Sequence, residues 1–390
     1  MVHRALASSL VLMSLGTAAR ADGPIVMGET RRIHSAVLKE DRVYRVSLPE
    51  SYGWAKDRRY PVLFLLDGQT HFLHTAGSVG YLAQQGEIPE MIVVAIDSTV
   101  RIRDFTQTDW PSVWVGGGGA SNFKRFLSSK LIPDVDKNYR SDGFRVLSGH
   151  SAGGQFALYC LTSDPSLFRA YFAISSSLDW DNNLPQRSLE QSLKATRELK
   201  AFLYVARSDD SGRALADYER LVETLKANSP QGFRWHDRAY PDETHGSVAL
   251  LAHIDALRQL YAEYRYHPDM AAKGLPFAEQ HFRDVSKKVG WTFAVPEGVI
   301  NELGYAALSR GKTQDAIALF KRNVEANPNS ANAHDSLSDG YAKAGMWKEA
   351  AGASDRAAAL AGEFELPNRS RFIARARKMN DRFKSIKPAK

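Results

Sequence analysis

Residues 144–154 read FRVLSGHSAGG and form the most informative stretch of this 390-residue chain. A strand-like run at 144–148 leads into the pentad Gly-x-Ser-x-Gly at 149–153, and a helical pattern follows at 155–161. A strand, a sharp turn and a helix in this order are the context of a nucleophile elbow. Such a turn strains the backbone of its central residue, so the flanking Gly149 and Gly153 must lack side chains. We therefore expect the Ser151 hydroxyl to stand above the edge of a sheet.

The same alternation of strand and helix extends over the surrounding sequence. From about residue 43 to 265, short apolar runs alternate with helical patterns such as 121–139 and 212–228. Continuous runs bounded by turn residues are typical of strands buried on both faces; they are 61–66, 91–96, 170–174 and 201–205. This alternation predicts an α/β fold with a mostly parallel central sheet flanked by helices.

A histidine downstream can serve the serine. A serine hydroxyl is a poor nucleophile near neutral pH and needs a base to take its proton. Doubly wound hydrolases supply the partners in the chain order Ser, acid, His, each on a loop after a strand. His245 follows the strand-like segment 233–239 and precedes the helical segment 247–264. We therefore predict that His245 is the base.

The acid is expected after the strand 201–205, where the chain reads Ala206-Arg207-Ser208-Asp209-Asp210. Either aspartate can hold an imidazole in the correct tautomer and stabilise its cation. We favour Asp209, with Asp210 as the second candidate and a Ser–His dyad without an acid as the third.

Two main-chain N–H groups are candidates for an oxyanion hole. The N–H of Ala152 lies at the start of the helix after the elbow, where helix N-termini favour negative charge. The second donor should come from the loop after an early central strand, Asp67-Gly68-Gln69. We assign it to Gln69, with Gly68 less favoured and a plain turn as the alternative reading of this loop.

Cofactor and metal sites are not expected. Cys160 is the single cysteine, which excludes an internal disulfide framework and any multi-cysteine metal site. His71 and His74 have helical spacing but lack a third ligand. Residues 311–313 read Gly-Lys-Thr but join two helical segments, so they do not form a phosphate-binding loop.

The C-terminal third contains an internal repeat. Three positions recur at one constant spacing: Leu303, Gly311 and Ala316 match Leu337, Gly345 and Ala350. This spacing is the period of tetratricopeptide repeats, which need about three units to bury their faces. Either residues 275–295 or a tail helix must cap them, or they pack on the first domain; the tail spaces Phe372, Ala376, Met379 and Phe383 as an amphipathic helix would. The repeats are a candidate surface for a protein partner.

The N-terminus has the pattern of a secretory signal. Arg4 precedes a short apolar run at 5–15, and an A-x-A site at 19–21 follows. The run is shorter than the roughly 20 residues that span a membrane, so we expect a periplasmic or secreted protein beginning near Asp22.

The net charge of +7 does not indicate nucleic-acid binding. Residues 1–21 contribute +2, and residues 368–390 contribute +8 from nine Lys and Arg against one Asp, so the body carries −3. The basicity belongs to the two ends of the chain.

Several motifs resemble the "putative esterase" family, which includes esterase D, enterobactin-type siderophore esterases, feruloyl esterases and mycolyltransferases. They are the segments 65–68, 101–106, 131–133, 139–140 and 149–154 within about residues 25–265. The resemblance implies an α/β-hydrolase with Ser151 as nucleophile, His245 as base, Asp209 as acid, and the N–H groups of Gln69 and Ala152 as oxyanion donors. Family members often carry Glu where Asp209 stands.

Our first hypothesis is an exported serine esterase that acts on siderophore-type or other aromatic esters without a cofactor. Because they follow strand ends, Arg101 and Arg103 are candidates to contact an anionic substrate, and Trp110, Trp114 and Trp180 are candidates to line an aromatic pocket. A surface or packing role is the alternative for all of these side chains. An acyltransferase with the same triad and an inert, repeat-based interaction protein are the alternatives. The predicted divisions are a signal peptide at 1–21, the hydrolase domain at 22–267, a connecting segment at 268–294, repeats at 295–364, and a basic capping helix and tail at 365–390.

Overall fold

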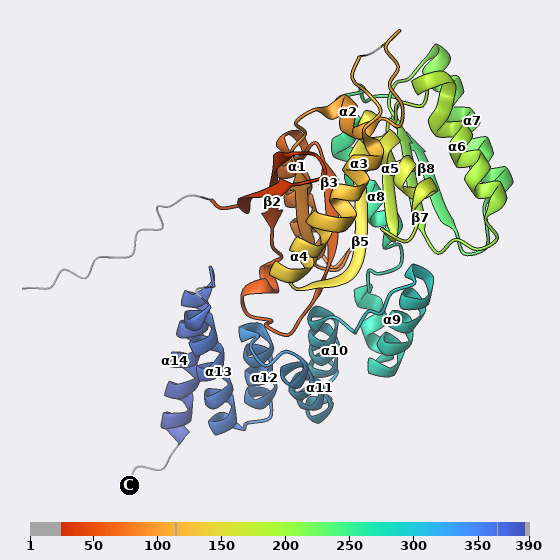
Figure 1. Ribbon diagram of the computed structural model, residues 1–390. Helices are drawn as coiled ribbons and strands as arrows, with labels where there is room; N and C mark the ends of the chain where they lie inside the picture. Colours follow the sequence, from red (N-terminus) through yellow and green to blue (C-terminus); the bar gives the residue numbers. More distant parts are fainter. Residues whose placement is uncertain (1–24, 114, 365, 387–390) are drawn as a thin grey trace, which may run out of the picture.

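The computed structural model describes residues 25–113, 115–364 and 366–386 (Figure 1). The expected signal peptide and Trp114 lie outside the described residues. No helix in the described ranges is long and apolar enough to cross a lipid bilayer.

The centre of the molecule is one mixed sheet, in which the described strands follow the order β1-β2-β4-β3-β5-β6-β7-β8. Strands β1 and β2 form an antiparallel edge, and all pairs from β4 to β8 are parallel, which confirms the mostly parallel sheet. The strands are β1 (Glu29–Ser35), β2 (Glu40–Ser47), β3 (Tyr60–Leu66), β4 (Ile92–Ile96), β5 (Ser141–His150), β6 (Ala170–Ile174), β7 (Phe202–Arg207) and β8 (Arg234–Ala239).

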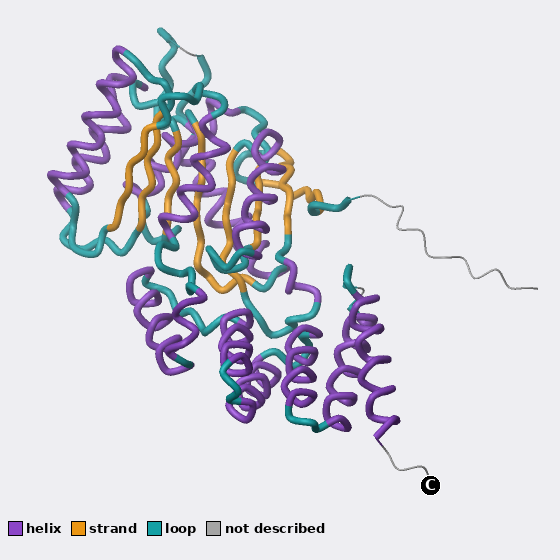
Figure 2. The backbone as a smooth tube through the Cα atoms, turned by 180° about the vertical axis from the view of Figure 1, so that it is seen from behind, coloured by secondary structure: helices purple, strands orange, loops and turns teal. Residues whose placement is uncertain are grey.

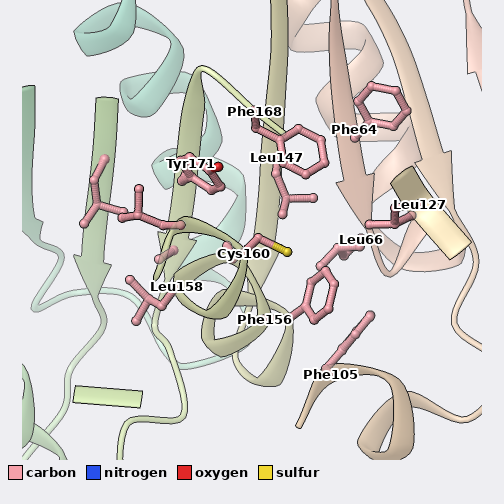
Figure 3. Close-up of a cluster of buried hydrophobic side chains, with 14 of the residues drawn as sticks. Phe64, Leu66, Phe105, Leu127, Leu147, Phe156, Leu158, Cys160, Phe168 and Tyr171 are labelled. Carbon is pink, nitrogen blue, oxygen red and sulfur yellow. The ribbon is translucent and has the colours of Figure 1, made fainter. Parts of the chain in front are cut away.

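The central strands are buried on both sides. Every residue of β3 is buried; Phe64 and Leu66 face one apolar cluster, while Leu63 and Leu65 face the other. Figure 3 shows the first cluster, in which Phe64 and Leu66 lie with residues of β5 and α5. A continuous apolar run is therefore what these strands need, because neither face meets water.

Helices cover the two faces (Figures 1 and 2). The first face carries α2 (Arg101–Phe105), α3 (Ala120–Phe126), α4 (Ile132–Asn138), α5 (Ala152–Ser163), α6 (Trp180–Ala195) and α7 (Gly212–Asn228). The second carries α1 (Gly68–Gln84), α8 (Val248–Leu260) and α9 (Leu275–Val289). The predicted helix 121–139 consists of α3, a π-helical segment (Leu127–Leu131) and α4.

Residues 268–294, predicted to be a connecting segment, pack on the hydrolase core. They form a 3-10 helix (Pro268–Lys273) and then α9. Phe282 and Val285 of α9 belong to the same buried cluster as Phe144 and Tyr261. The apolar face of α9 therefore extends one face of the hydrolase core.

The C-terminal region is all-helical, with α10 (Glu297–Ser309), α11 (Thr313–Ala326), α12 (Ala331–Lys343), α13 (Trp347–Glu363) and α14 (Arg369–Ile386). The offset from the start of α10 to that of α12 equals the offset from α11 to α13, and both equal the period of the sequence repeat. A Cβ on Gly304 would lie 2.2 Å from the Phe320 ring, so only glycine permits this helix contact. Met379 of α14 packs with Ala350 and Ala351 of α13, so α14 covers the end of the array.

The helical region lies at the end of the sheet where the parallel strands begin. Arg58, just before β3, donates to the side-chain oxygen of Asn327 at 2.8 Å, and Asn329 donates to the Trp54 carbonyl at 3.2 Å. In Figures 1 and 2, α10 to α14 lie away from α2, which follows the carboxyl end of β4. The carboxyl edge of the sheet is therefore left uncovered by these helices.

Candidate active site

Ser151 occupies the turn between β5 and α5. Its backbone has φ 60° and ψ −120°, a conformation that L-residues rarely adopt. A Cβ on Gly149 would lie 2.2 Å from the Gly153 carbonyl oxygen, and one on Gly154 would lie 2.4 Å from the Ser176 hydroxyl. Gly149 is required, as predicted. The second steric requirement falls on Gly154, because a Cβ on Gly153 would meet only ordinary contacts from 3.5 Å.

Neighbouring strands and loops fix this turn. The Ser151 N–H donates to the Ile174 carbonyl at 2.9 Å, and its carbonyl accepts from the N–H of Ser177 at 3.2 Å. The Ser151 hydroxyl lies 3.5 Å from the Ser177 hydroxyl. Ser151 and His245 both line a cavity of about 440 Å³ at the carboxyl edge of the sheet.

His245 is exposed on the loop between β8 and α8 and is held from two sides. Its Nδ1 lies 3.0 Å from the Ser175 hydroxyl, and its carbonyl accepts from Nε2 of His150 at 2.6 Å. Within the part of the chain that the structure describes, no hydrogen bond joins the imidazole to the Ser151 hydroxyl. Catalytic hydrogen bonds are often long in unliganded enzymes and shorten when substrate binds.

The two candidate acids differ in position. The exposed Asp209 has no side-chain contact with the imidazole among the described residues; its N–H donates to the Glu243 carbonyl at 2.9 Å. Asp210 is half-buried and lines the cavity with His245. Its carboxylate accepts from the main-chain N–H and the hydroxyl of Ser208, both at 3.3 Å. The structure therefore brings Asp210, rather than the favoured Asp209, to the cavity.

The two predicted oxyanion donors lie in the first turns of helices. Ala152 begins α5, and Gln69 is the second residue of α1, positions at which an N–H has no acceptor within its own helix. Asp67 turns the chain with φ 54°, and a Cβ on Gly68 would lie 2.8 Å from the main chain of Ala95. Gly68 thus lets the loop approach β4 closely.

Arg101 joins this loop to the elbow. Its guanidinium forms an ion pair with the Asp67 carboxylate at 2.9 Å and donates to the His150 carbonyl, also at 2.9 Å. Arg103 pairs with Glu40 and Asp104, each at 2.7 Å. Both side chains are candidates from the sequence either to contact substrate or to have a packing role. Their ion pairs favour a structural role. For Arg101 this role couples the two segments that carry the predicted oxyanion donors.

Trp180 packs beneath a loop and does not line the cavity. It is buried, donates from Nε1 to the Thr108 carbonyl at 3.2 Å, and meets the Trp110 ring edge-on at 5.5 Å. Its indole therefore anchors the loop around Thr108. Trp180 is not among the residues that line this cavity, and its enclosure by that loop favours the packing role over an aromatic lining.

Sequence reasoning missed most of the cavity lining, including three polar residues near Ser151 and His245: Ser175, Ser177 and Arg213. Ser175 and Ser177 follow β6, which lies next to the nucleophile strand, and Arg213 lies in the first turn of α7. The available signal was position: each follows a parallel strand at the carboxyl edge, where such sheets bind ligands.

Four histidines lie behind the site, and burial lowers the pKa of each. Burial, together with the neighbouring His245 and His71 rings, lowers the pKa of His150 to about 4. Burial and His71 lower the pKa of His74 to about 4. Burial holds the pKa of His253 well below its ordinary value. No group of three or more His, Cys, Asp or Glu residues within the described ranges is arranged to hold a metal ion.

The family described as "Putative esterase" matches residues 35–246, which include Ser151 and His245. The chain belongs to this family. It is a carboxylic ester hydrolase on an α/β-hydrolase fold.

Individual relatives agree with this assignment. The chain is 28% identical over 262 residues to the ferri-bacillibactin esterase BesA of Bacillus subtilis, covering 59% of this chain and 87% of BesA. It is 30% identical over 226 residues to the siderophore triacetylfusarinine C esterase of Aspergillus fumigatus, covering 53% and 65% of the two chains. The crystal structure of an IroE-like serine hydrolase from Shewanella oneidensis superposes with a TM-score of 0.68 at 27% identity, over 76% of this chain and 99% of that one.

Proposed function

We propose that this esterase acts through an acyl-enzyme on Ser151, with His245 as the general base. The observation that carries the proposal is that both side chains line one cavity, with Ser151 on a strained turn at the start of a helix. Strain of this kind persists where the surrounding structure enforces it, and it is common at active sites. The relatives named as esterases support the same chemistry.

The mechanism follows from the two ring nitrogens of His245. Because Nδ1 faces the Ser175 hydroxyl, Nε2 is the nitrogen left to take the proton from the Ser151 hydroxyl. The Ser151 oxygen then adds to the ester carbonyl, and the N–H groups of Gln69 and Ala152 stabilise the oxyanion. The alcohol leaves with the proton from Nε2. Water, deprotonated by the same nitrogen, releases the acid and restores Ser151.

The proposed substrates are siderophore-type esters. Two of the relatives are named as esterases of such compounds. A catecholate ester that binds iron does so through anionic oxygens, so a cation in the cavity would favour its binding. Arg213 brings a guanidinium to the cavity, where it lies 3.6 Å from Asp217 and 3.3 Å from Asn183. These long contacts leave the side chain, which is 65% exposed, able to turn toward an anionic group.

We also propose export to the periplasm or the medium, on the strength of the leader-like pattern at 1–21. We assign the C-terminal helices to the tetratricopeptide type because their starts repeat with the period found in the sequence. N-terminal sequencing of protein recovered from the periplasm or medium should begin near Asp22. A product that retains Met1 would contradict export by cleavage.

The test of the chemistry is turnover of a short-chain p-nitrophenyl ester and of iron-free and ferric catecholate trilactones by the full chain. Ser151→Ala should abolish turnover of all three and labelling by a fluorophosphonate probe. Ser166→Ala is the matched control, because Ser166 is exposed and hydrogen-bonded only locally, to Asp164.

Two outcomes would contradict the proposal. Full turnover by Ser151→Ala would remove Ser151 from the chemistry. Absence of both labelling and turnover in the wild-type chain would favour an inert, repeat-based interaction protein. Product analysis with an added alcohol distinguishes hydrolysis from acyl transfer, since a transferase would form the new ester in place of the free acid.

A further inference from the structure

The Nδ1 atom of His245 meets a hydroxyl where a serine hydrolase ordinarily presents a carboxylate. Ser175 Oγ lies 3.0 Å from this nitrogen. Ser175 directly follows β6 and is only 6% exposed; its N–H donates to the Ala206 carbonyl of β7 at 2.8 Å. The backbone of Ser175 has φ 41°, so Ser175, like Ser151, is a strained non-glycine residue beside the cavity. The hydroxyl is thus held in place by the sheet itself.

The hydroxyl of Ser208 lies between the Ser175 hydroxyl and the carboxylate of Asp210. Ser175 Oγ lies 3.4 Å from Ser208 Oγ, which donates to Asp210 at 3.3 Å. Ser208 is fully buried, so bulk water does not compete for its hydroxyl. A line of polar groups therefore runs from His245 through two serines to Asp210.

The direction of the hydrogen bonds along this line follows from its two ends. Asp210, when ionised, can only accept, so Ser208 donates to it and is left to accept from Ser175. Ser175, having donated to Ser208, can then only accept from Nδ1–H. A proton on Nδ1 leaves Nε2 free of hydrogen, which is the tautomer that a general base requires.

We propose that Ser175 is the positioning residue for His245 and fixes its tautomer, with Asp210 acting at one remove through Ser208. This inference rests on the proposed function of Ser151 and His245 and specifies the arrangement behind the base. Asp209 takes no part in it, because it is exposed and its carboxylate forms no hydrogen bond or ion pair with the imidazole among the described residues.

The kinetic test compares Ser175→Ala, Ser208→Ala, Asp210→Asn and Asp209→Asn on a p-nitrophenyl ester. A hydrogen bond to a group that becomes charged is worth roughly a tenfold to hundredfold effect, so Ser175→Ala should lower kcat by that factor. KM should change by less than about twofold, because Ser175 acts through His245 rather than on the substrate. Ser208→Ala and Asp210→Asn should give smaller losses, and Asp209→Asn the smallest.

Ser175→Gly tests whether a loss of activity in Ser175→Ala comes from backbone strain and misfolding rather than from the missing hydroxyl. Glycine accepts the positive φ without strain but also lacks the hydroxyl, so its kcat should match that of Ser175→Ala. Thermal unfolding of both variants reports whether the fold is intact. Ser166→Ala again serves as the matched serine control.

A second readout is independent of turnover. In protein with 15N-labelled histidine, long-range correlations from the ring C–H protons distinguish Nδ1–H from Nε2–H. We expect His245 to be in the Nδ1–H form in the wild type and in a mixture of tautomers in Ser175→Ala. An unchanged tautomer would overturn the proposal even if the chain proved to be no esterase.

The opposite kinetic result would also overturn the proposal. If Asp209→Asn or Asp210→Asn lowered kcat by the roughly 10⁴-fold typical of a direct triad acid while Ser175→Ala stayed near wild type, a carboxylate would contact His245 directly during turnover. In contrast, full turnover by Ser151→Ala would reject the proposed function and leave the tautomer measurement to decide the role of Ser175.

Discussion

Nε2 of His150 lies 2.6 Å from the carbonyl oxygen of His245, so the residue before the nucleophile holds the main chain of the base. This contact spans 95 positions of sequence and joins the elbow to the loop between β8 and α8. The separation between nucleophile and base is therefore set partly by one imidazole that takes no part in the chemistry.

Replacing His150 should separate its role as a donor from its bulk. His150→Leu removes the hydrogen bond and should lower kcat on a p-nitrophenyl ester about tenfold. His150→Gln keeps an N–H donor and should retain most of the activity. Equal losses in the two variants would show that the ring shape, rather than the hydrogen bond, is what positions His245.

The buried histidines should make the protein sensitive to acid. Their pKa values are lowered in the folded state, so below about pH 6.5 the unfolded chain binds protons that the folded chain excludes. The free energy of unfolding is therefore unaffected by these histidines above that pH, and it decreases as the pH falls toward 4. Protonation of His150 in the unfolded chain alone should lower the free energy of unfolding by on the order of 3 kcal/mol between pH 6.5 and pH 4.

Urea unfolding between pH 7 and pH 4.5 measures this dependence. His150→Gln removes one titrating group, so its free energy of unfolding should fall less over the same range. A wild-type free energy that stays constant over this range would contradict the neutral, buried state of these rings.

Arg101 provides a test between a structural role and substrate binding. Arg101→Ala breaks the tie between Asp67 and the His150 carbonyl, and displacement of the oxyanion segments should lower kcat on the order of tenfold to a hundredfold. Arg101→Lys should not restore activity, since an ammonium cannot reproduce the forked contact. If Arg101 instead bound substrate, KM would rise for an anionic ester while turnover of a neutral ester stayed normal.

Arg213 should show the kinetic pattern of a substrate-binding residue, with a change in KM for an anionic ester only. Arg213→Ala should raise KM for a catecholate trilactone about fivefold, as expected for an exposed charge pair, and leave a neutral p-nitrophenyl ester unaffected. Arg220→Ala is the control, because Arg220 contacts the same Asp217 at 3.5 Å but does not line the cavity. Equal effects of the two substitutions would reduce the role of Arg213 to general surface charge.

The glycines of the elbow give a matched pair for stability. Gly154→Ala forces a methyl group to within 2.4 Å of the Ser176 hydroxyl and should destabilise the fold by about 1–3 kcal/mol. Gly153 lies in α5, and a methyl group there meets only ordinary contacts with Leu66 and Asp67, so Gly153→Ala should be neutral or stabilising by up to about 1 kcal/mol. Thermal unfolding distinguishes the two, and a reversed order would contradict the steric account.

The features that sequence predicted well have a strong local pattern. The apolar run at 61–66, the helix at 212–228 and the C-terminal repeat period each depend on residues close together in the chain, and the structure contains all three. The positive φ of Ser151 was also predictable, because glycines on both sides of a serine between a strand and a helix indicate a strained turn.

The details behind the base were not predictable, since they depend on side-chain direction. Asp209 and Asp210 are neighbours in sequence, but only Asp210 lines the cavity. Ser175 has no distinguishing pattern in a run of three serines, and its importance depends on His245, which is 70 positions away. The packing of α9 on the hydrolase core was not predicted either. An amphipathic pattern shows that a helix has an apolar face but does not show which element covers that face.

The contact between Arg58 and Asn327 fixes the C-terminal helices beneath the amino ends of the strands, whereas Ser151 follows the carboxyl end of β5. The C-terminal helices and the Ser151 turn therefore lie at opposite ends of the central sheet. A partner bound to α10 to α14 would therefore leave the cavity accessible to substrate, and the bound enzyme would keep its activity.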